Sequence, residues 1–336
     1  MPLPSRHPLA PESHASPLLV AAPMAGLTHS AFRRLLAEFG GCDLVYTEML
    51  AGTRLLVEAP DSPYIRRHAG DGRVVYQLLL RDERRVEQII DKLRACRPDG
   101  LDINCACPAA GVRFIGGGAD LFEDAARLDA VLNAVRRAWQ GPLSVKIRLG
   151  RAPETHWRER LLDRLQRIRD AGVDSLTVNP RFAVDRLTRP ARHDLLPWIC
   201  AEAGMPVLAN GDITGPETLA AHPAHFADCA GVMLGRMAVV RPWVFAAWRQ
   251  GEGYAAPDAG AVWRRLITLL QEDFPPERVV LRLKHFTGWY SRNFVYGHLL
   301  AGKVRHLRDA ETLIRITEEF LASAPATVRT PPLYDL

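Results

Sequence analysis

The sequence predicts a parallel (β/α)₈ barrel followed by a smaller all-helical domain. Eight short runs are apolar throughout, and helical patterns fill most of the intervals between them. Strands of this kind belong in a parallel sheet that is covered on both faces, and a span of about 230 residues suits a barrel of usual size. From about residue 257 the strand pattern stops and only helical spacing remains.

Each expected strand is a short apolar run that ends at a turn. The first, Leu18–Ala22, leads into Pro23 and Gly26, and Thr28 can cap the helix that follows. The other strands are expected at Asp43–Thr47, Arg73–Leu79, Gly100–Ile103, Leu143–Ile147, Asp174–Val178, Met205–Ala209 and Gly231–Leu234. A doubly wound open sheet is the competing fold, but no G-x-G-x-x-G motif follows the first strand.

The expected helices have apolar residues that recur every three to four positions. In the segment Glu83–Cys96, Val86, Ile89, Ile90 and Leu93 keep this spacing. The other helices are expected at Ala31–Phe39, Ala125–Trp139 and His156–Ala171 in the barrel, and at Ala259–Glu272, Pro276–Phe294 and Ala310–Ala322 after it.

These elements divide the chain into three parts. Residues 1–17 contain five prolines and no apolar core, and we expect a flexible leader. Residues 18–250 form the expected barrel and residues 257–336 the helical domain. The sequence has no run of about 18 apolar residues, so no membrane span is expected. Six cysteines in 336 residues are too sparse for a secreted disulfide framework, which indicates reduced thiols and the cytoplasm.

The basic residues of the chain are almost all arginine. Four lysines and 39 arginines give a formal net charge of +5. The planar guanidinium group suits phosphate, so the balance weakly favours a polyanionic partner. A high arginine content can equally reflect the base composition of a genome.

The stretch Leu101–Leu121 carries the first candidate for chemistry. It joins an apolar strand to a loop that contains Cys105, Cys107 and three consecutive glycines. A thiol at the carboxyl end of a parallel strand lies where such folds place their active sites. Metal binding is disfavoured, because a zinc site needs about four ligands and no second cysteine pair occurs. Cys107, which precedes Pro108, is the candidate acid or nucleophile, and Cys105 is the weaker candidate.

The last two strands each end in a motif that suits phosphate. Asn210, Gly211 and Asp212 follow one strand, and Gly235 and Arg236 follow the next. Barrels of this type often bind a cofactor phosphate at these two loops, through backbone N–H groups and a basic side chain. Each motif alone would more often be an ordinary turn.

Two polar residues at other strand ends suit an electron-rich ring. Lys146 lies inside an otherwise apolar strand, where a charge is costly to bury without a partner. A cation there can stabilise negative charge that develops on a reduced cofactor, or it can form an ordinary ion pair. Gln77 can both donate to and accept from an amide-edged ring.

Seven motifs in a fixed order resemble those of the flavin-dependent tRNA-dihydrouridine synthases. They are APMAGLT (22–28), YTEM (46–49), Gln77, DINCACP with GGGADL (102–108 and 116–121), SVKIRLG (144–150), ANGDI (209–213) and LGR (234–236). A further segment, RLKHFTGWY (282–290), resembles the helical-domain motif of that family. The resemblance implies a barrel that binds FMN and a C-terminal helical domain that binds tRNA.

The resemblance also implies a reaction. NADPH reduces FMN, the flavin N5 passes a hydride to C6 of a uracil, and a cysteine thiol protonates C5. Cys107 matches the proton donor and Asn104 the residue that holds the uracil edge. The expected flavin residues are Pro23, Met24, Gln77, Lys146, Asn179, Asn210, Gly211, Asp212, Gly235 and Arg236, and the expected RNA-binding residues are Arg181, Arg282, Lys284 and His285.

Two positions depart from the family pattern. The family usually has His-Gly-Arg after the sixth strand, whereas this chain has Asn179, Pro180 and Arg181. Asn179 can form hydrogen bonds but carries no charge. Near the catalytic cysteine, Ala106 and Ala110 replace a glycine and a lysine of the family, which removes one possible phosphate contact.

The charge pattern of the helical domain supports an RNA partner independently. Between Arg278 and Arg308 there are seven lysines and arginines and no acidic residue. Five aromatic residues are interleaved with them: Phe286, Trp289, Tyr290, Phe294 and Tyr296. Basic side chains can follow phosphates and aromatic rings can stack on unpaired bases. A second basic run, from Arg181 to His193, could border the same channel. The alternative is that the aromatic rings pack in the core beneath a solvated basic face.

The sequence therefore predicts an FMN-dependent, NADPH-using reductase that acts on a uridine in tRNA as a monomer, without an obligatory protein partner. Three alternatives stay open: a small-molecule flavin dehydrogenase on the same barrel, a dihydrouridine synthase that acts on another RNA, and a catalytically silent RNA-binding module.

Overall fold

The structure is a computed structural model that describes residues 17–334. Within this range nine parallel strands form one sheet in the order β2-β1-β9-β8-β7-β6-β5-β4-β3, and pairing of β2 with β4 closes it. β2 (Leu44–Tyr46) and β3 (Leu50–Ala51) both pair with β4 (Val74–Leu79), so they are two pieces of one barrel position. The predicted eight-stranded barrel is confirmed. The expected leader, residues 1–17, lies outside the described residues except for Pro17.

The remaining strands and the barrel helices follow the predicted alternation. The strands are β1 (Leu18–Ala21), β5 (Gly100–Cys105), β6 (Leu143–Ile147), β7 (Ser175–Val178), β8 (Val207–Asn210) and β9 (Gly231–Leu234). The helices are α1 (Ser30–Phe39), α2 (Gly52–Leu55), α3 (Val86–Arg94), α4 (Ala110–Phe114), α5 (Ala119–Glu123), α6 (Ala125–Ala138), α7 (Trp157–Asp170), α8 (Leu196–Ala203), α9 (Pro216–Ala221), α10 (Pro223–Phe226), α11 (Arg236–Val240) and α12 (Val244–Gln250).

The barrel helices form because their apolar residues recur on one face. In α6, Leu128, Leu132 and Val135 are buried against the strands, and Asp124 caps the helix by accepting a hydrogen bond from the Arg127 N–H at 3.1 Å. The barrel interior has a second, smaller apolar cluster. Its members are Val20, Ala22, Leu44, Tyr46, Val75, Leu208 and Met233. Above this cluster the inward-facing side chains become polar, toward the carboxyl ends of the strands.

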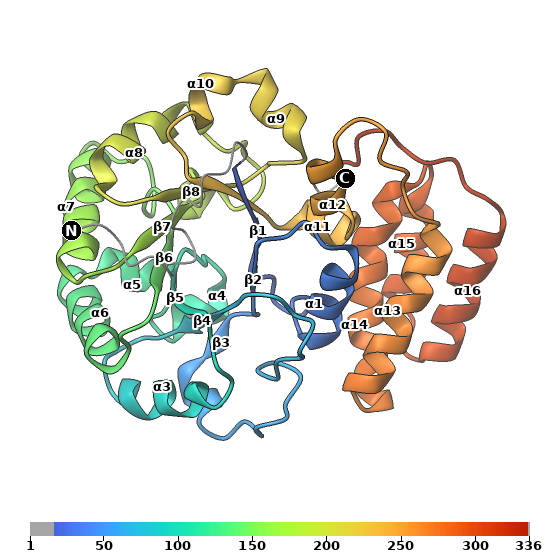
Figure 1. The fold of residues 1–336 in the computed structure, drawn as a ribbon, viewed down its shortest axis with the longest axis horizontal. Helices are drawn as coiled ribbons and strands as arrows, with labels where there is room; N and C mark the ends of the chain where they lie inside the picture. The colour runs from blue at the N-terminus through green and yellow to red at the C-terminus, as the bar shows by residue number, and fades with distance from the viewer. Residues whose placement is uncertain (1–16, 335–336) are drawn as a thin grey trace.

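The helices after the barrel pack beside it as one group (Figure 1). They are α13 (Ala259–Asp273), α14 (Pro276–Tyr290), α15 (Gly297–Arg305) and α16 (Ala310–Ala322). α13 lies along α1, where Asp273 accepts hydrogen bonds from Ser30 and from Arg66, the latter at 2.6 Å. None of the helices within residues 17–334 has both the length and the apolar character needed to cross a membrane.

One boundary in this region differs from the prediction. The expected helix Pro276–Phe294 ends at Tyr290, and a short 3₁₀ turn then leads to α15, which was not predicted. Tyr296 adopts a left-handed conformation with φ of 63°, and a Cβ on Gly297 would lie 1.7 Å from the carbonyl oxygen of Ser291. The chain therefore reverses sharply at a place that only glycine can occupy.

Candidate active site

A network of buried polar side chains joins the neighbouring strands β4, β5 and β6. Gln77 donates through Nε2 to Asp102 Oδ2 at 2.7 Å and accepts through Oε1 from Asn104 Nδ2 at 2.8 Å. Ser144 donates to the other carboxylate oxygen of Asp102 at 2.6 Å. Burial raises the pKa of Asp102 to about 6, against the opposing effect of the Ser144 and Gln77 hydrogen bonds. These bonds fix which way the Gln77 and Asn104 amides face.

The loop after β5 holds Cys107 at the rim of the barrel. Asn104 Oδ1 accepts from the N–H of Ala106 at 3.2 Å and of Cys107 at 3.0 Å. A Cβ on Gly118 would lie 2.6 Å from the carbonyl oxygen of Cys107, so the loop packs as tightly as its glycines allow. Cys107 is half-buried, whereas Cys105 lies in the core between the strands and helices, where burial raises the pKa of its thiol. Of the two thiols, Cys107 is the one at the mouth.

A cavity of about 200 Å³, here called the mouth cavity, opens at the ends of β1, β6, β7, β8 and β9. Nine of the ten expected flavin residues line it: Pro23, Met24, Lys146, Asn179, Asn210, Gly211, Asp212, Gly235 and Arg236. The tenth, Gln77, lies in the buried network described above. The structure thus brings together residues from five separate strand ends.

Lys146 is held within the mouth cavity by a side-chain hydrogen bond. Its Nζ donates to Asn210 Oδ1 at 2.8 Å, and Asn210 Nδ2 donates to the carbonyl oxygen of Met233 at 2.8 Å. Desolvation, with a contribution from the nearby Arg148, lowers the pKa of Lys146 to about 8. A cation that is costly to keep charged is suited to a partner that carries or develops negative charge.

Asp212 is the centre of a second charged group in the mouth cavity. Its Oδ1 accepts from Arg236 at 2.7 Å, and its Oδ2 accepts from Arg181, from the Ala191 N–H at 2.8 Å and from the Tyr334 hydroxyl at 2.7 Å. Burial alone would raise the pKa of Asp212, but these hydrogen bonds and the positive charge of Arg181 lower it to about 2. Asp212 also has φ of 52°, an unusual conformation for a residue other than glycine. It holds the two arginines and leaves no carboxylate oxygen without a donor.

Two glycines of the mouth cavity carry backbone donors that the described part of the protein does not use. Within residues 17–334, the backbone N–H groups of Gly211 and Gly235 donate to no acceptor. Side chains at these positions would meet their neighbours, because a Cβ on Gly211 would lie 3.0 Å from Asn179 Oδ1 and one on Gly235 would lie 3.1 Å from Met24 Sδ. Free N–H groups beside an arginine suit a phosphate. The residues present therefore fit the phosphate of a flavin mononucleotide.

The expected RNA-binding residues are only partly available to a ligand. Arg181 is 0% exposed and bonded to Asp212, so in this structure its guanidinium group is not free to contact RNA. Arg282 is also buried: it lies 4.0 Å from the centre of the Phe274 ring and donates to the Arg278 carbonyl oxygen at 3.0 Å. These contacts likewise hold the Arg282 guanidinium group within the protein.

The other two expected RNA-binding residues, Lys284 and His285, are at least partly exposed to solvent. Lys284 is half-buried and donates through Nζ to the Leu307 carbonyl oxygen at 2.9 Å. His285 is exposed, and a Cβ on Gly26 would lie 3.0 Å from its Nδ1. His285 therefore links α14 to the loop after β1 that lines the mouth cavity.

The aromatic residues interleaved with the basic residues of the helical domain are also partly buried and partly exposed. Phe286, Tyr290 and Phe294 are buried in the core, so they do not form a stacking surface for bases. Trp289 is half-buried and lines the mouth cavity, and Tyr296 is 67% exposed. The alternative of a core-packed aromatic set is therefore correct for the three buried rings.

Several residues of the site were not predicted. Asp102 and Ser144 orient the polar network through their hydrogen bonds. The sequence offered one sign of this, because Asp102 is a charged residue inside an otherwise apolar strand. Phe114, at the end of the short helix after Cys107, is 93% exposed, and the sequence pattern did not predict this exposure. Tyr334 reaches Asp212 from the far end of the described chain. Within residues 17–334, His, Cys, Asp and Glu side chains do not gather in groups of three that could hold a metal ion.

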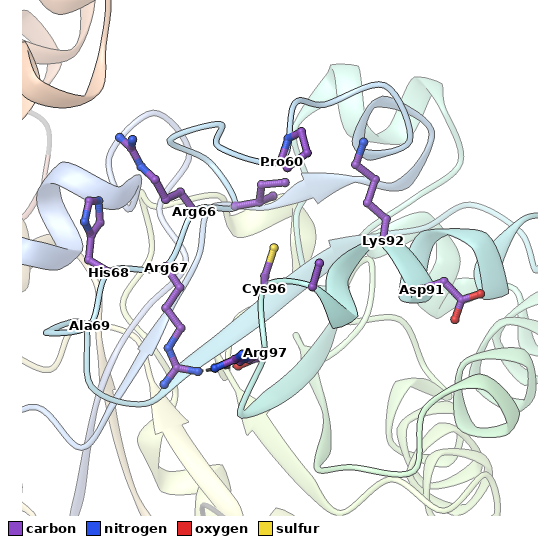
Figure 2. Close-up of a pocket in the computed structure, with 11 residues that line it drawn as sticks. Pro60, Arg66, Arg67, His68, Ala69, Asp91, Lys92, Cys96 and Arg97 are labelled. Atoms are coloured by element: carbon purple, nitrogen blue, oxygen red, sulfur yellow. Dashed lines mark hydrogen bonds between the residues drawn. The ribbon is translucent and has the colours of Figure 1, made fainter.

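A larger cavity, of about 850 Å³, lies away from this site on the flank of the barrel (Figure 2). It forms where segment 56–72, instead of a long helix, connects β3 to β4. Three of its basic side chains are bonded within the protein: Arg66 to Asp273 at 2.6 Å, Arg67 to Asp99 at 2.7 Å and Lys92 to the Leu56 carbonyl oxygen at 3.1 Å. None of the residues that line this flank cavity is among the expected flavin or RNA-binding residues.

The fold and the mouth cavity are typical of a parallel-barrel enzyme whose site lies at the carboxyl ends of the strands. The family model described as dihydrouridine synthase (Dus) matches residues 19–293. The tRNA-dihydrouridine synthase B of Pseudomonas putida is 29% identical over 323 residues, which cover 93% of this chain and 94% of that protein. The corresponding protein of Escherichia coli is 31% identical over 231 residues, or 68% of this chain and 70% of that one. The chain belongs to the dihydrouridine synthase family and is an oxidoreductase.

Solved structures give the same fold at low sequence identity. The old yellow enzyme homologue from Zymomonas mobilis has a TM-score of 0.51 and 14% identity, over 73% of this chain and 91% of that chain. A morphinone reductase variant in complex with tetrahydroNAD also has a TM-score of 0.51, at 11% identity, over 73% of this chain and 90% of that chain. These likenesses concern the barrel fold alone.

Proposed function

We propose that this protein reduces the C5–C6 double bond of a uridine in tRNA to give dihydrouridine, with FMN as cofactor and NADPH as reductant. The observation that carries the proposal is the mouth cavity, which is lined by nine residues that match the flavin positions of the family. One of them, Lys146, pairs with Asn104 on β5, the strand that leads to the loop of Cys107. The tRNA-dihydrouridine synthases that the chain resembles support the substrate.

The residues of the mouth cavity would divide the binding of FMN between them. Arg236 and the N–H groups of Gly211 and Gly235 would hold the phosphate, since they are donors at one end of the cavity. Lys146, fixed by Asn210, would face the pyrimidine edge of the ring, where it stabilises negative charge. When bound, the flavin supplies the hydride that C6 of the uracil receives.

The uracil would be oriented and protonated by the loop after β5. Asn104 is fixed by Gln77 and can bond the uracil edge. The Cys107 thiol would give its proton to C5 as the hydride arrives at C6, and the resulting thiolate would regain a proton from solvent. The target nucleotide has to leave its stack, because a stacked base cannot meet a ring at the bottom of a cavity.

The exposed basic residues of α14 and α15 would bind the RNA backbone. Arg278, Lys303 and Arg305 are exposed, and none is paired with a carboxylate within residues 17–334. A polyanion bound through such groups is released steeply as salt rises. We place residues 257–336, which contain these helices, as the tRNA-binding region.

The two cysteines allow a matched test of the mechanism. We expect the Cys107→Ala variant to bind FMN and to oxidise NADPH but to form at least 100-fold less dihydrouridine, consistent with the usual contribution of a general acid, roughly 10²–10⁴-fold. The Cys105→Ala variant, changed at a buried thiol at the end of β5, is expected to keep its activity. Full activity of Cys107→Ala would place the proton donor elsewhere.

The dehydrogenase alternative is tested by surface charge rather than by deletion. α13 and α14 bury Trp263 and Phe286 against the barrel, so removing the helical region would uncover the core. The double variant Lys303→Glu, Arg305→Glu should lose tRNA reduction while NADPH still reduces the flavin at the normal rate. Arg137→Glu, at an exposed position on α6, is the control. If the double variant and the control reduce tRNA equally, α15 does not bind the substrate.

A further inference from the structure

The segment Pro331–Tyr334 returns from the helical region and lies against the mouth cavity. Arg236 donates through Nη1 to the Leu333 carbonyl oxygen, although the two residues are 97 positions apart. The Leu333 side chain is 6% exposed and lines the cavity. The Tyr334 hydroxyl donates to Asp212 Oδ2 at 2.7 Å, and its ring centre lies 5.5 Å from the Arg236 guanidinium carbon.

This segment is fixed along its length by the end of the helical region. Arg292 donates through Nη1 to the carbonyl oxygens of Pro332 and Tyr334, both at 3.0 Å. A few residues earlier, Val328 donates its N–H to the Asn293 carbonyl oxygen at 2.8 Å and accepts from Arg241 Nη2 at 2.7 Å. The contacts with Arg236 and Asp212 are therefore part of a continuous attachment to the barrel.

We propose that Pro331–Tyr334 forms a wall of the cofactor site and retains the phosphate end of the bound flavin mononucleotide. This inference rests on the proposed function, because it assigns the phosphate to Arg236. The segment would act by holding the Arg236 side chain in place and by closing the phosphate end of the cavity to solvent. Leu333 and Tyr334 are positioning residues here, since they act through Arg236 and Asp212.

The donor count at Arg236 favours retention over competition. A guanidinium group has five N–H donors. Arg236 gives one to Leu333 and one to Asp212, which leaves three for a phosphate. The phosphate therefore does not need to displace the segment in order to reach Arg236.

The neutralised charge of Asp212 also favours a role of the segment in retaining the phosphate. A carboxylate beside a phosphate would repel it unless its charge were neutralised. Asp212 is neutralised by two arginines, and Tyr334 supplies a further donor to the oxygen that Arg181 already contacts. Loss of the Tyr334 hydroxyl would leave a more strongly negative oxygen next to the phosphate end.

The test compares flavin mononucleotide with riboflavin, which has the same ring and no phosphate. The cofactor-free full chain, a deletion of residues 331–336 and the Tyr334→Phe variant are titrated with each flavin by flavin fluorescence. We expect the dissociation constant for flavin mononucleotide to rise about 10-fold in the deletion and about 3-fold in Tyr334→Phe, in line with the loss of charge-assisted hydrogen bonds. The dissociation constant for riboflavin should stay unchanged.

Two controls keep the result interpretable. Tyr296→Phe removes an exposed hydroxyl outside the mouth cavity and should change neither constant. Thermal unfolding of the cofactor-free proteins reports any general loss of fold. An unchanged or tighter affinity for flavin mononucleotide in the deletion would overturn the inference, and so would an equal loss for riboflavin, which would indicate a role in folding. If the full chain binds neither flavin, the proposed function fails together with the inference.

Discussion

Lys146 offers a direct test of the electrostatics of the mouth cavity. Its side chain is 8% exposed, and desolvation lowers its pKa from an ordinary 10.5 to about 8. At about 1.36 kcal/mol for each pKa unit, this amounts to about 3 kcal/mol against the charged form. Replacing Lys146 with an apolar side chain would remove this penalty, but it would also remove the hydrogen bond to Asn210. The loss of that bond costs about 1–2 kcal/mol, which has to be subtracted from the gain.

The sign of the effect on stability follows from the direction of the pKa shift. Between pH 8 and 10.5 the unfolded chain holds a proton on Lys146 that the folded chain has lost, so stability rises with pH in this window. Below pH 8 the folded protein bears the full cost of a desolvated charge. The Lys146→Met variant should therefore have a free energy of unfolding about 1–2 kcal/mol higher than the native protein at pH 7. Near pH 11, where the charge penalty is gone and only the lost hydrogen bond remains, it should be about 1–2 kcal/mol lower.

Nuclear magnetic resonance can observe this titration because the chain has only four lysines. With lysine labelled at the ε carbon, one of the four signals should titrate near pH 8, and that signal should be missing in Lys146→Met. Addition of FMN should raise its pKa, since the electron-rich edge of the ring favours the ammonium form. If the signal that the variant lacks titrates above pH 10, Lys146 is solvated and our account of its role is wrong.

Three further predictions address the exposed ring of Phe114, the buried carboxyl group of Asp102 and the binding of tRNA. Phe114→Ala should lower the rate of tRNA reduction several-fold while Phe114→Tyr keeps it, because a flat exposed ring can stack on a base at about 1–3 kcal/mol; equal rates in single-turnover assays would exclude stacking. The pKa of Asp102 is raised to about 6 from an ordinary 3.8, so the stability that its proton provides is present below pH 3.8 and lost by about pH 6. Urea unfolding at pH 4 and pH 7 should therefore show a loss of about 2 kcal/mol that Asp102→Asn does not share; an identical loss in both proteins would contradict the raised pKa. The affinity for tRNA should fall roughly 10³-fold or more between 50 and 200 mM salt if six or more phosphates are contacted, and a flat response in a filter-binding assay would exclude a phosphate-tracking surface.

The sequence by itself determined the barrel and the residues at its rim. Parallel strands all end at the same edge of a closed barrel, so Lys146, Asn210 and Gly235 could be placed together from their positions after apolar runs. The same logic located Cys107, because the expected strand Gly100–Ile103 ends shortly before it. These predictions depended only on local order along the chain and on the topology that the apolar runs imply.

The tertiary structure alone decided which charged and aromatic side chains remain free. Arg181 and Arg282 lie in basic segments that resemble RNA-binding sequences. In the structure, however, the guanidinium group of Arg181 pairs with Asp212 and that of Arg282 packs on the Phe274 ring. Buried charges and rings are satisfied by partners from distant segments, and nothing in the local sequence names those partners. The same reason hid the contact between Arg236 and Leu333, which exists only because the helical region docks beside the barrel and directs the chain back across its mouth.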